Sequence, residues 1–228
     1  MENLSLQKLA RIAGIYYLII VIMGFWGIMY VPSKIRVKDD PAATMNNLIQ
    51  NEFLFRSGTL SQMISSISFI FLVLVLYRIF KDTDQHRARL MVVFVLVQIP
   101  VFFLAEAFNI AALMVAKGSL MQSLELPQKQ DFVYFLLRIY KFCIITIIIF
   151  WGLWLIPLGQ LILKSGYLPR IIGFLLIVGG WAYVVESLDY ILLDTKLAPL
   201  TNYTSILHTS AELLTVAWLL VKGIKVVK

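Results

Sequence analysis

Carboxylates in the middle of long apolar segments are the residues of this sequence best placed to do chemistry. Counted along a helix from the basic residues at the predicted cytoplasmic boundary, Glu106 and Glu186 lie roughly 24 Å deep, and Glu212 lies roughly 15 Å deep. A charge at such a depth in a hydrocarbon core is costly, and an intramembrane ionisable residue is by default a functional candidate. We therefore favour a functional site for these three residues over a structural ion-pair network.

Each of these three acids has a polar companion three or four residues away, and two basic residues form a further pair. This spacing places both side chains of a pair on one side of a helix. The pairs are Glu106 with Asn109, Arg138 with Lys141, Glu186 with Asp189, and His208 with Glu212, and Gln62 lies at a similar depth. These faces should converge on an outward-opening pocket, because charges that faced lipid would be costly. Its walls would come from aromatic residues: Tyr134, Tyr140, Tyr183 and Tyr190.

Four of these polar positions also have simpler interpretations. Arg138 and Lys141 either extend to the outer interface as anchors or belong to the pocket. Asn109 and Asp189 lie close to the ends of their spans, and we expect them to be solvated helix ends.

The pocket is expected to bind a small polar, amphipathic or cationic ligand, for transport, sensing or protection. Its four acids outnumber its two bases, which favours a cation or a protonated amine. This hypothesis requires no metal or cofactor, and no catalytic residue is assigned.

Two alternatives belong to other functional classes. One is a membrane-embedded hydrolase or transferase for lipid-like substrates, in which His208, Glu212 and Glu186 bind a divalent metal such as zinc. The other is a non-catalytic partner subunit of a membrane complex. Bis-histidine haem binding is excluded because the second histidine, His86, falls in a predicted loop, and the single Cys143 excludes a multi-thiolate centre.

The elements that must position these residues are membrane spans. The chain has 228 residues, of which 60% are hydrophobic and 14% are charged, and its mean hydropathy is +0.85. Such a composition excludes a cytosolic enzyme and a nucleic-acid binder. We predict an all-α integral membrane bundle, a single transmembrane domain over 1–228, with six transmembrane helices at about 9–31, 58–80, 90–116, 132–163, 168–193 and 203–221.

Charge on the alternate loops predicts the orientation of this bundle. One face holds eleven Lys and Arg against three Asp and Glu, whereas the other holds seven against six. The more basic face should be cytoplasmic, which places both termini in the cytoplasm.

Two connections carry clear signals of local structure. The outer loop 32–57 contains Asp40 followed by Pro41, and then apolar residues at helical spacing, so we expect a short outer amphipathic helix that is either a packed lid or a gate. On the inner side, Gly166 and Pro169 predict a tight hairpin. Glycines recur every seven residues: Gly152 and Gly159 indicate close helix packing, and Gly166 and Gly173 belong to the hairpin.

The same hairpin carries a family resemblance. The segments 152–159 and 165–173, together with 10–18 and 52–58, resemble the bacterial multi-pass membrane proteins of domain-of-unknown-function family 4386. The resemblance implies a bacterial cytoplasmic (inner) membrane location and no particular activity. The expected partners are the lipid bilayer and a small-molecule or lipid ligand, with a homo-oligomer or a membrane partner as further possibilities and no nucleic acid.

Overall fold

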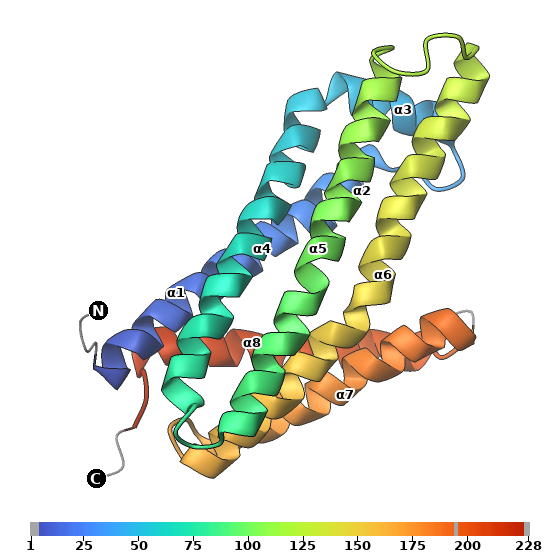
Figure 1. The fold of residues 1–228 in the computed structure, drawn as a ribbon. Helices are drawn as coiled ribbons and strands as arrows, with labels where there is room; N and C mark the ends of the chain where they lie inside the picture. Colours follow the sequence, from blue (N-terminus) through green and yellow to red (C-terminus); the bar gives the residue numbers. More distant parts are fainter. Residues whose placement is uncertain (1–4, 194–195, 226–228) are drawn as a thin grey trace. The chain divides into compact units, whose positions relative to one another are not determined.

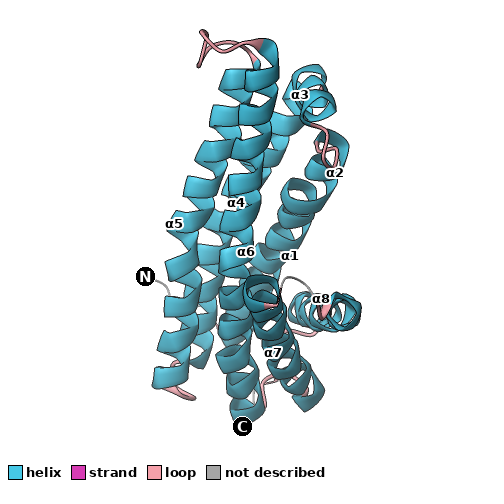
Figure 2. Cartoon of the chain, turned by 90° about the vertical axis from the view of Figure 1, so that its right-hand side faces the viewer, coloured by secondary structure: helices cyan, strands magenta, loops and turns pink. Residues whose placement is uncertain are grey.

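Helices account for nearly all of the chain that the structure describes. The computed structural model describes residues 5–193 and 196–225, and no strand occurs among them (Figures 1 and 2). The helical segments, in chain order, are α1 (Leu6–Gly24), η1 (Phe25–Tyr30), α2 (Val31–Ile35), α3 (Pro41–Gln50), α4 (Glu52–Phe80), α5 (Gln85–Ala116), α6 (Leu126–Ser165), α7 (Arg170–Leu192) and α8 (Ala198–Val221). Glu2, Asp194 and Lys228, which enter the charge count, lie outside the described residues.

Five helices are long and apolar enough to cross a membrane. They are the continuous run Leu6–Ile35 and the helices α4, α5, α6 and α7, and they match the first five predicted spans. The chain is therefore a multi-pass membrane protein. Within α8, the apolar segment described is the shorter Ile206–Val221.

The first span is not a uniform α-helix. Its middle, η1, has π-helical hydrogen bonding, and the run returns to α-helical form in α2. The rings of Trp26 and Tyr30 stack on this segment with their centroids 4.7 Å apart. Short π-helical insertions are uncommon and often occur at functional sites.

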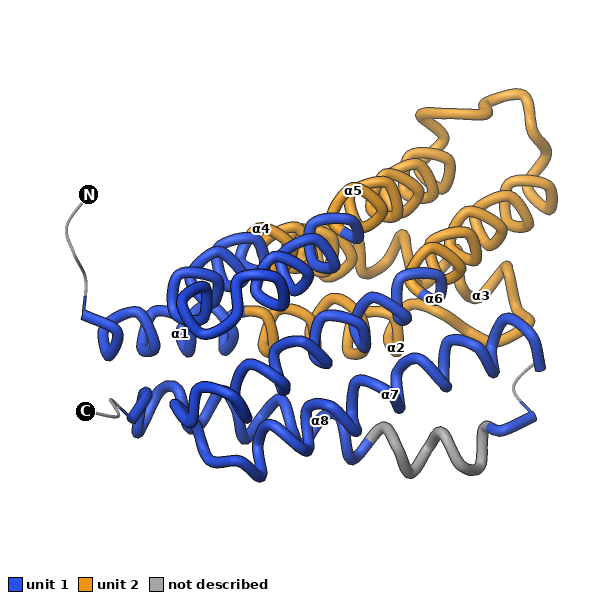
Figure 3. Tube along the Cα trace, turned by 60° about the horizontal axis from the view of Figure 1, so that its bottom comes forward, with its two compact units in different colours: residues 1–19, 68–98, 145–228 blue, residues 20–67, 99–144 orange. Residues whose placement is uncertain are grey.

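The fold divides into two compact units (Figure 3). Unit 1 comprises 1–19, 68–98 and 145–228, and unit 2 comprises 20–67 and 99–144. Helices α1, α4, α5 and α6 contribute residues to both units.

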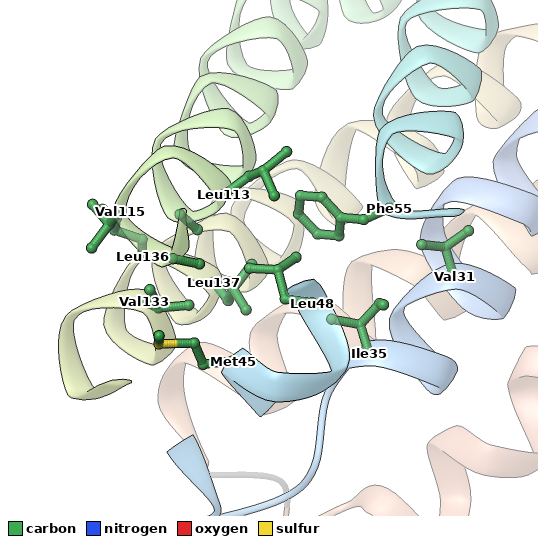
Figure 4. Close-up of a cluster of buried hydrophobic side chains, with 12 residues drawn as sticks. Val31, Ile35, Met45, Leu48, Phe55, Leu113, Val115, Val133, Leu136 and Leu137 are labelled. Atoms are coloured by element: carbon green, nitrogen blue, oxygen red, sulfur yellow. The ribbon is translucent and has the colours of Figure 1, made fainter. Parts of the chain in front are cut away.

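The core of unit 2 is apolar and includes the predicted short helix, α3. Asp40 caps α3 by accepting a hydrogen bond from the backbone N–H of Ala43 at 2.8 Å. Met45 and Leu48 enter the buried cluster shown in Figure 4, while Ile49 remains exposed. The helix thus packs on the core of unit 2 through one apolar face.

In unit 1, helices α6 and α7 approach each other at paired glycines. A Cβ atom added to Gly152 would lie 2.2 Å from the carbonyl oxygen of Gly180, and one added to Gly159 would lie 2.5 Å from that of Gly173. Gly166, with φ of +67°, ends the preceding helix, as predicted from its place in the hairpin. Only glycine allows the two backbones to come this close.

Candidate functional site

Five side chains of unit 1 form what we call the Glu212 cluster: Tyr17, Tyr183, Glu186, His208 and Glu212. Both carboxylate oxygens of Glu212 accept hydrogen bonds from phenols, Oε2 from Tyr17 at 2.8 Å and Oε1 from Tyr183 at 3.0 Å. The cluster therefore joins residues of α1, α7 and α8.

His208 lies buried beside this carboxylate. The ring of Tyr183 stacks on the imidazole, with centroids 3.6 Å apart and 27° between the planes. The imidazole Nε2 lies 3.6 Å from Oε2 of Glu186, which exceeds a normal hydrogen-bond distance. Neither imidazole nitrogen has a hydrogen-bond partner among the residues that the structure describes.

Small residues of unit 1 bring the helices of this cluster together. On α1, Ala10, Ala13 and Gly14 are buried on the same face as Tyr17, and a Cβ added to Gly14 would lie 2.9 Å from the Leu220 side chain. On α7, a Cβ added to Gly179 would lie 3.0 Å from Cα of His208. The close approach of α8 to α1 and α7 thus places Tyr17 and Tyr183 against Glu212.

A second group, the Glu106 cluster, belongs to unit 2: Arg36, Thr59, Glu106, Asn109 and Tyr140. Glu106 is only 2% exposed, and its Oε2 accepts a hydrogen bond from Nδ2 of Asn109 at 3.0 Å. Thr59 and Tyr140 face the same carboxylate, and Arg36 is the positive charge that acts on it. The Arg36 guanidinium also lies over the Tyr140 ring, 4.9 Å from its centroid.

Arg36 lies directly after the first span, at the point where α2 ends. Burial lowers the pKa of its guanidinium, and this effect is opposed by Tyr140 and Glu106. Because an arginine starts from a pKa above 12, the group stays charged. Glu106 therefore has a permanent cation as a neighbour.

A small pocket in unit 2, which we call the Asn109 pocket, adjoins this cluster. Its polar lining comes from Arg36, Thr59 and Asn109, and its apolar lining comes from η1, α2 and α4: Gly27, Val31, Pro32, Ile35, Phe55 and Gly58. Val31, Ile35 and Phe55 are drawn in Figure 4. The pocket is thus amphipathic.

Buried acceptors accompany this pocket. Oδ1 of Asn109 and Oε1 of Gln62 are buried and have no hydrogen-bond partner within the described part of the chain. Gln62 packs beside the pocket-lining Gly27, since a Cβ built there would lie 3.3 Å from that Oε1. Buried polar atoms without partners are rare in folded proteins and call for an explanation.

Comparison with known proteins places the chain in a family. The sequence profile described as Domain of unknown function (DUF4386) matches residues 12–223, which is most of the chain. The chain belongs to the DUF4386 family. No curated protein and no solved structure matches it.

The predicted site residues of this DUF4386 protein fall into both units. Unit 1 brings together Glu186, His208 and Glu212, and unit 2 brings together Glu106 and Asn109. That all of them line one pocket stays a prediction.

Two helix-end assignments in the DUF4386 chain were wrong. Asn109 is 6% exposed because it turns inward to Glu106, and Asp189 is 3% exposed. Oδ1 of Asp189 accepts the backbone N–H of Leu197 at 2.9 Å, which holds the connection to α8. Both polar groups are buried with hydrogen-bond partners and do not face solvent.

The remaining two candidates in the DUF4386 chain are surface residues of unit 2. Arg138 is exposed, and its guanidinium lies about 6 Å from the ring centroids of Tyr134 and Phe142. Lys141 is exposed as well. This arrangement agrees with anchoring at an interface and gives no sign of a role in the pocket.

Three residues of the two clusters were missed by sequence reasoning. Arg36 was counted only as a loop charge, and Thr59 and Tyr17 gave no charge signal in an apolar span. The spacing of Ala10, Ala13, Gly14 and Tyr17, at positions i, i+3, i+4 and i+7, was the available clue to the buried face of the first span.

The metal alternative finds no support in this DUF4386 protein. Across 5–193 and 196–225, no three His, Cys, Asp or Glu side chains are grouped so that they could hold a metal ion. His208, Glu186 and Glu212 are neighbours, and the two oxygens of Glu212 accept hydrogen bonds from Tyr17 and Tyr183.

Proposed function

We propose that this DUF4386 protein binds the polar group of a small polar or amphipathic molecule at the Asn109 pocket. The observation that carries the proposal is the unpartnered Oδ1 of Asn109, a buried acceptor in a residue that lines the pocket. A hydroxyl or amine of a ligand would supply the missing donor.

The lining of the pocket supports an amphipathic ligand. Val31, Ile35 and Phe55 offer apolar contact, while Thr59 and Arg36 offer polar groups beside Asn109. Binding sites for small molecules commonly combine an apolar wall with a few placed polar groups. The π-helical segment η1 contributes Gly27 to this wall, and such segments often accompany function.

Charge favours a neutral head group over a cation in this pocket. The surplus of acids in the sequence suggested a cation, but Arg36 adds a positive charge to the lining of the pocket, and its charge also acts on Glu106. A neutral polar head group would meet the lining without leaving a buried charge unpaired. Transport, sensing and protection are all compatible with such binding.

We further propose that the protein lies in a bacterial cytoplasmic membrane with both termini inside. The excess of Lys and Arg on one set of loops supports this orientation. In that arrangement α8 makes the sixth crossing, α3 lies on the outer side, and the Asn109 pocket opens outward.

Native mass spectrometry of the purified full-length protein tests the binding proposal. Wild type should retain a bound small molecule, and Thr59→Val should retain less of it, because the substitution removes a pocket hydroxyl at nearly constant shape. Thr209→Val, at an exposed position of α8, is the matched control and should retain the molecule.

Three ten-carbon probes then define the head group: decanol, decylammonium and decanoate. Decanol should raise the melting temperature of wild type most, and Thr59→Val should weaken its binding about threefold to tenfold. Equal responses of Thr59→Val and Thr209→Val to every probe, with no retained mass in wild type, would refute the proposal.

A further inference from the structure

The imidazole of His208 and the carboxylate of Glu186 face each other in unit 1 without a satisfactory hydrogen bond. His208 Nε2 and Glu186 Oε2 are 3.6 Å apart, and both atoms are buried. Neither atom has a hydrogen-bond partner among the described residues, and the same holds for Nδ1 of His208. The pair therefore places two buried polar atoms opposite each other within the range of an ion pair, while the Glu186 side chain as a whole stays 32% exposed.

The neighbouring acid, Glu212, is hydrogen-bonded to other residues. Both oxygens of Glu212 already accept hydrogen bonds, from Tyr17 and from Tyr183. Glu186 still has a free buried acceptor, and it is this oxygen that lies closest to the ring nitrogen. Of the two acids near His208, Glu186 is the one with a buried oxygen that no described residue engages.

A proton on the imidazole of His208 would supply a hydrogen-bond donor to Glu186. A neutral imidazole carries one N–H, so whichever nitrogen holds it, the other is a buried lone pair that needs a donor. One proton taken from water onto that nitrogen gives an imidazolium with two N–H donors. The Nε2–H then points at Oε2 of Glu186, and a charge-assisted bond of about 2.8 Å can replace the present gap.

We propose that Glu186 and His208 form a proton-binding site inside the membrane-spanning part of unit 1. On binding one proton, the net charge of the pair changes from −1 to zero, which favours uptake where an uncompensated charge is costly. Nothing in this step requires a ligand in the Asn109 pocket, so the two proposals stand separately.

The surroundings of the pair position the imidazole for this role. Tyr183 of α7 stacks on one ring face, and the backbone of Gly179 packs against the His208 backbone, which leaves the nitrogen edge for Glu186. The other titratable groups that face the site are Glu212 of α8 and, through it, Tyr17 of α1. The hydrogen bonds from Tyr17 and Tyr183 fix the position of the Glu212 carboxyl group beside the imidazole.

Labelled histidine gives a direct test. The chain has two histidines, so the full-length protein with ¹⁵N-histidine, held in lipid nanodiscs, shows two imidazoles, and His86→Gln leaves only that of His208. Spectra recorded from about pH 9 to about pH 4 bracket an ordinary imidazole titration. We expect the His208 nitrogens to convert reversibly from a neutral to a doubly protonated ring.

Coupling to Glu186 separates a proton site from a structural contact. In the His86→Gln background, Glu186→Gln should change the proton affinity of His208 about tenfold or more, whereas Glu125→Gln, at an exposed position in unit 2, should leave it unchanged. If Glu186→Gln does not fold, Glu186→Asp replaces it in the test. This variant keeps the carboxylate but moves it away by one methylene, and it should also change the proton affinity of His208.

Two results would overturn the proposal. One is an imidazole of His208 that keeps the same protonation state throughout the range. The other is a titration in Glu186→Gln or Glu186→Asp that coincides with that of the background protein. Thr59→Val should leave the titration unchanged in either case, so failure of the Asn109 pocket and failure of the proton site are distinguishable.

Discussion

Tyr183 stacks on the ring of His208 and, through its hydroxyl, donates a hydrogen bond to Glu212. The two residues that it contacts are four positions apart, so they lie one turn apart on the same face of α8. A single side chain of α7 thus holds the polar face of α8 at two points. Loss of either contact should loosen the pairing of these helices in a measurable way.

Removing a phenol hydroxyl of the Glu212 cluster should destabilise the protein. Tyr17→Phe and Tyr183→Phe each leave one oxygen of Glu212 without its donor, at a cost of about 1 to 3 kcal/mol. Thermal unfolding in mild detergent measures this cost. Tyr16→Phe is the matched control, since its ring stacking on Phe71 is retained, and it should change stability by less than about 0.5 kcal/mol.

The glycine contact between α6 and α7 should tolerate no side chain. Gly152→Ala places a methyl group 2.2 Å from the carbonyl oxygen of Gly180, so the helices must separate, at a cost of about 1 to 3 kcal/mol or more. Gly24→Ala is the control, because its added Cβ would meet only Ser65 Oγ, at 3.9 Å. A melting temperature of Gly152→Ala equal to that of Gly24→Ala would contradict this packing.

Arg36 and Glu106 should be coupled energetically. Arg36→Gln removes the positive charge that acts on the buried carboxyl group of Glu106 and should lower the free energy of unfolding by about 1 to 3 kcal/mol. The double variant with Glu106→Gln should lose less than the sum of the two single losses. A double-mutant cycle of unfolding free energies measures the coupling. Additive losses would show that the two charges do not interact.

The stability of unit 1 should depend on Asp84 in a pH-dependent way. This residue accepts hydrogen bonds from Lys164, at 2.9 Å, and from Arg87, and these bonds hold the pKa of its carboxyl well below the ordinary range. A lowered folded-state pKa contributes stability above the unfolded pKa of about 3.9, and the contribution is lost progressively as the pH falls below it.

Melting temperatures of wild type and Asp84→Asn should therefore differ at neutral pH and converge as the pH falls below about 4. Added salt should reduce the neutral-pH difference, because the ion pairs are at the surface. Asp82→Asn, in the same turn and exposed, is the control. A difference that stays constant down to strong acid would contradict the assigned ion pairs.

Hydropathy predicted the spans well because twenty or so consecutive apolar residues admit few other structures. It did not predict that α6 would begin at Leu126, because the first turns contain the polar residues Gln128, Lys129 and Asp131 and have the composition of a loop. The π-helical segment η1 near the end of the first span was also missed. Its residues are as apolar as those of an α-helix, and it contains no charged residue that would indicate the change in helical register.

The candidate site was predictable where charge and spacing act together. The pairing of Glu106 with Asn109 and the grouping of His208 with Glu212 follow from spacings of three and four. The prediction that Asp189 is solvated was wrong because it used only the distance of the residue from the membrane boundary. That distance does not show which side of the helix packs against other helices. Tyr17 was missed because a phenol has no charge at neutral pH, although its donor role depends on burial next to a carboxylate.

The π-helical turn at Phe25–Tyr30 has a consequence for comparing family members. Each residue of an α-helix advances the face by about 100°, so a one-residue deletion that turned this segment into plain α-helix would rotate everything after it by about that angle. Val31 and Ile35 would then leave the lining of the Asn109 pocket. An alignment of relatives that shows a one-residue gap here therefore separates those with a different pocket wall from those that share this one.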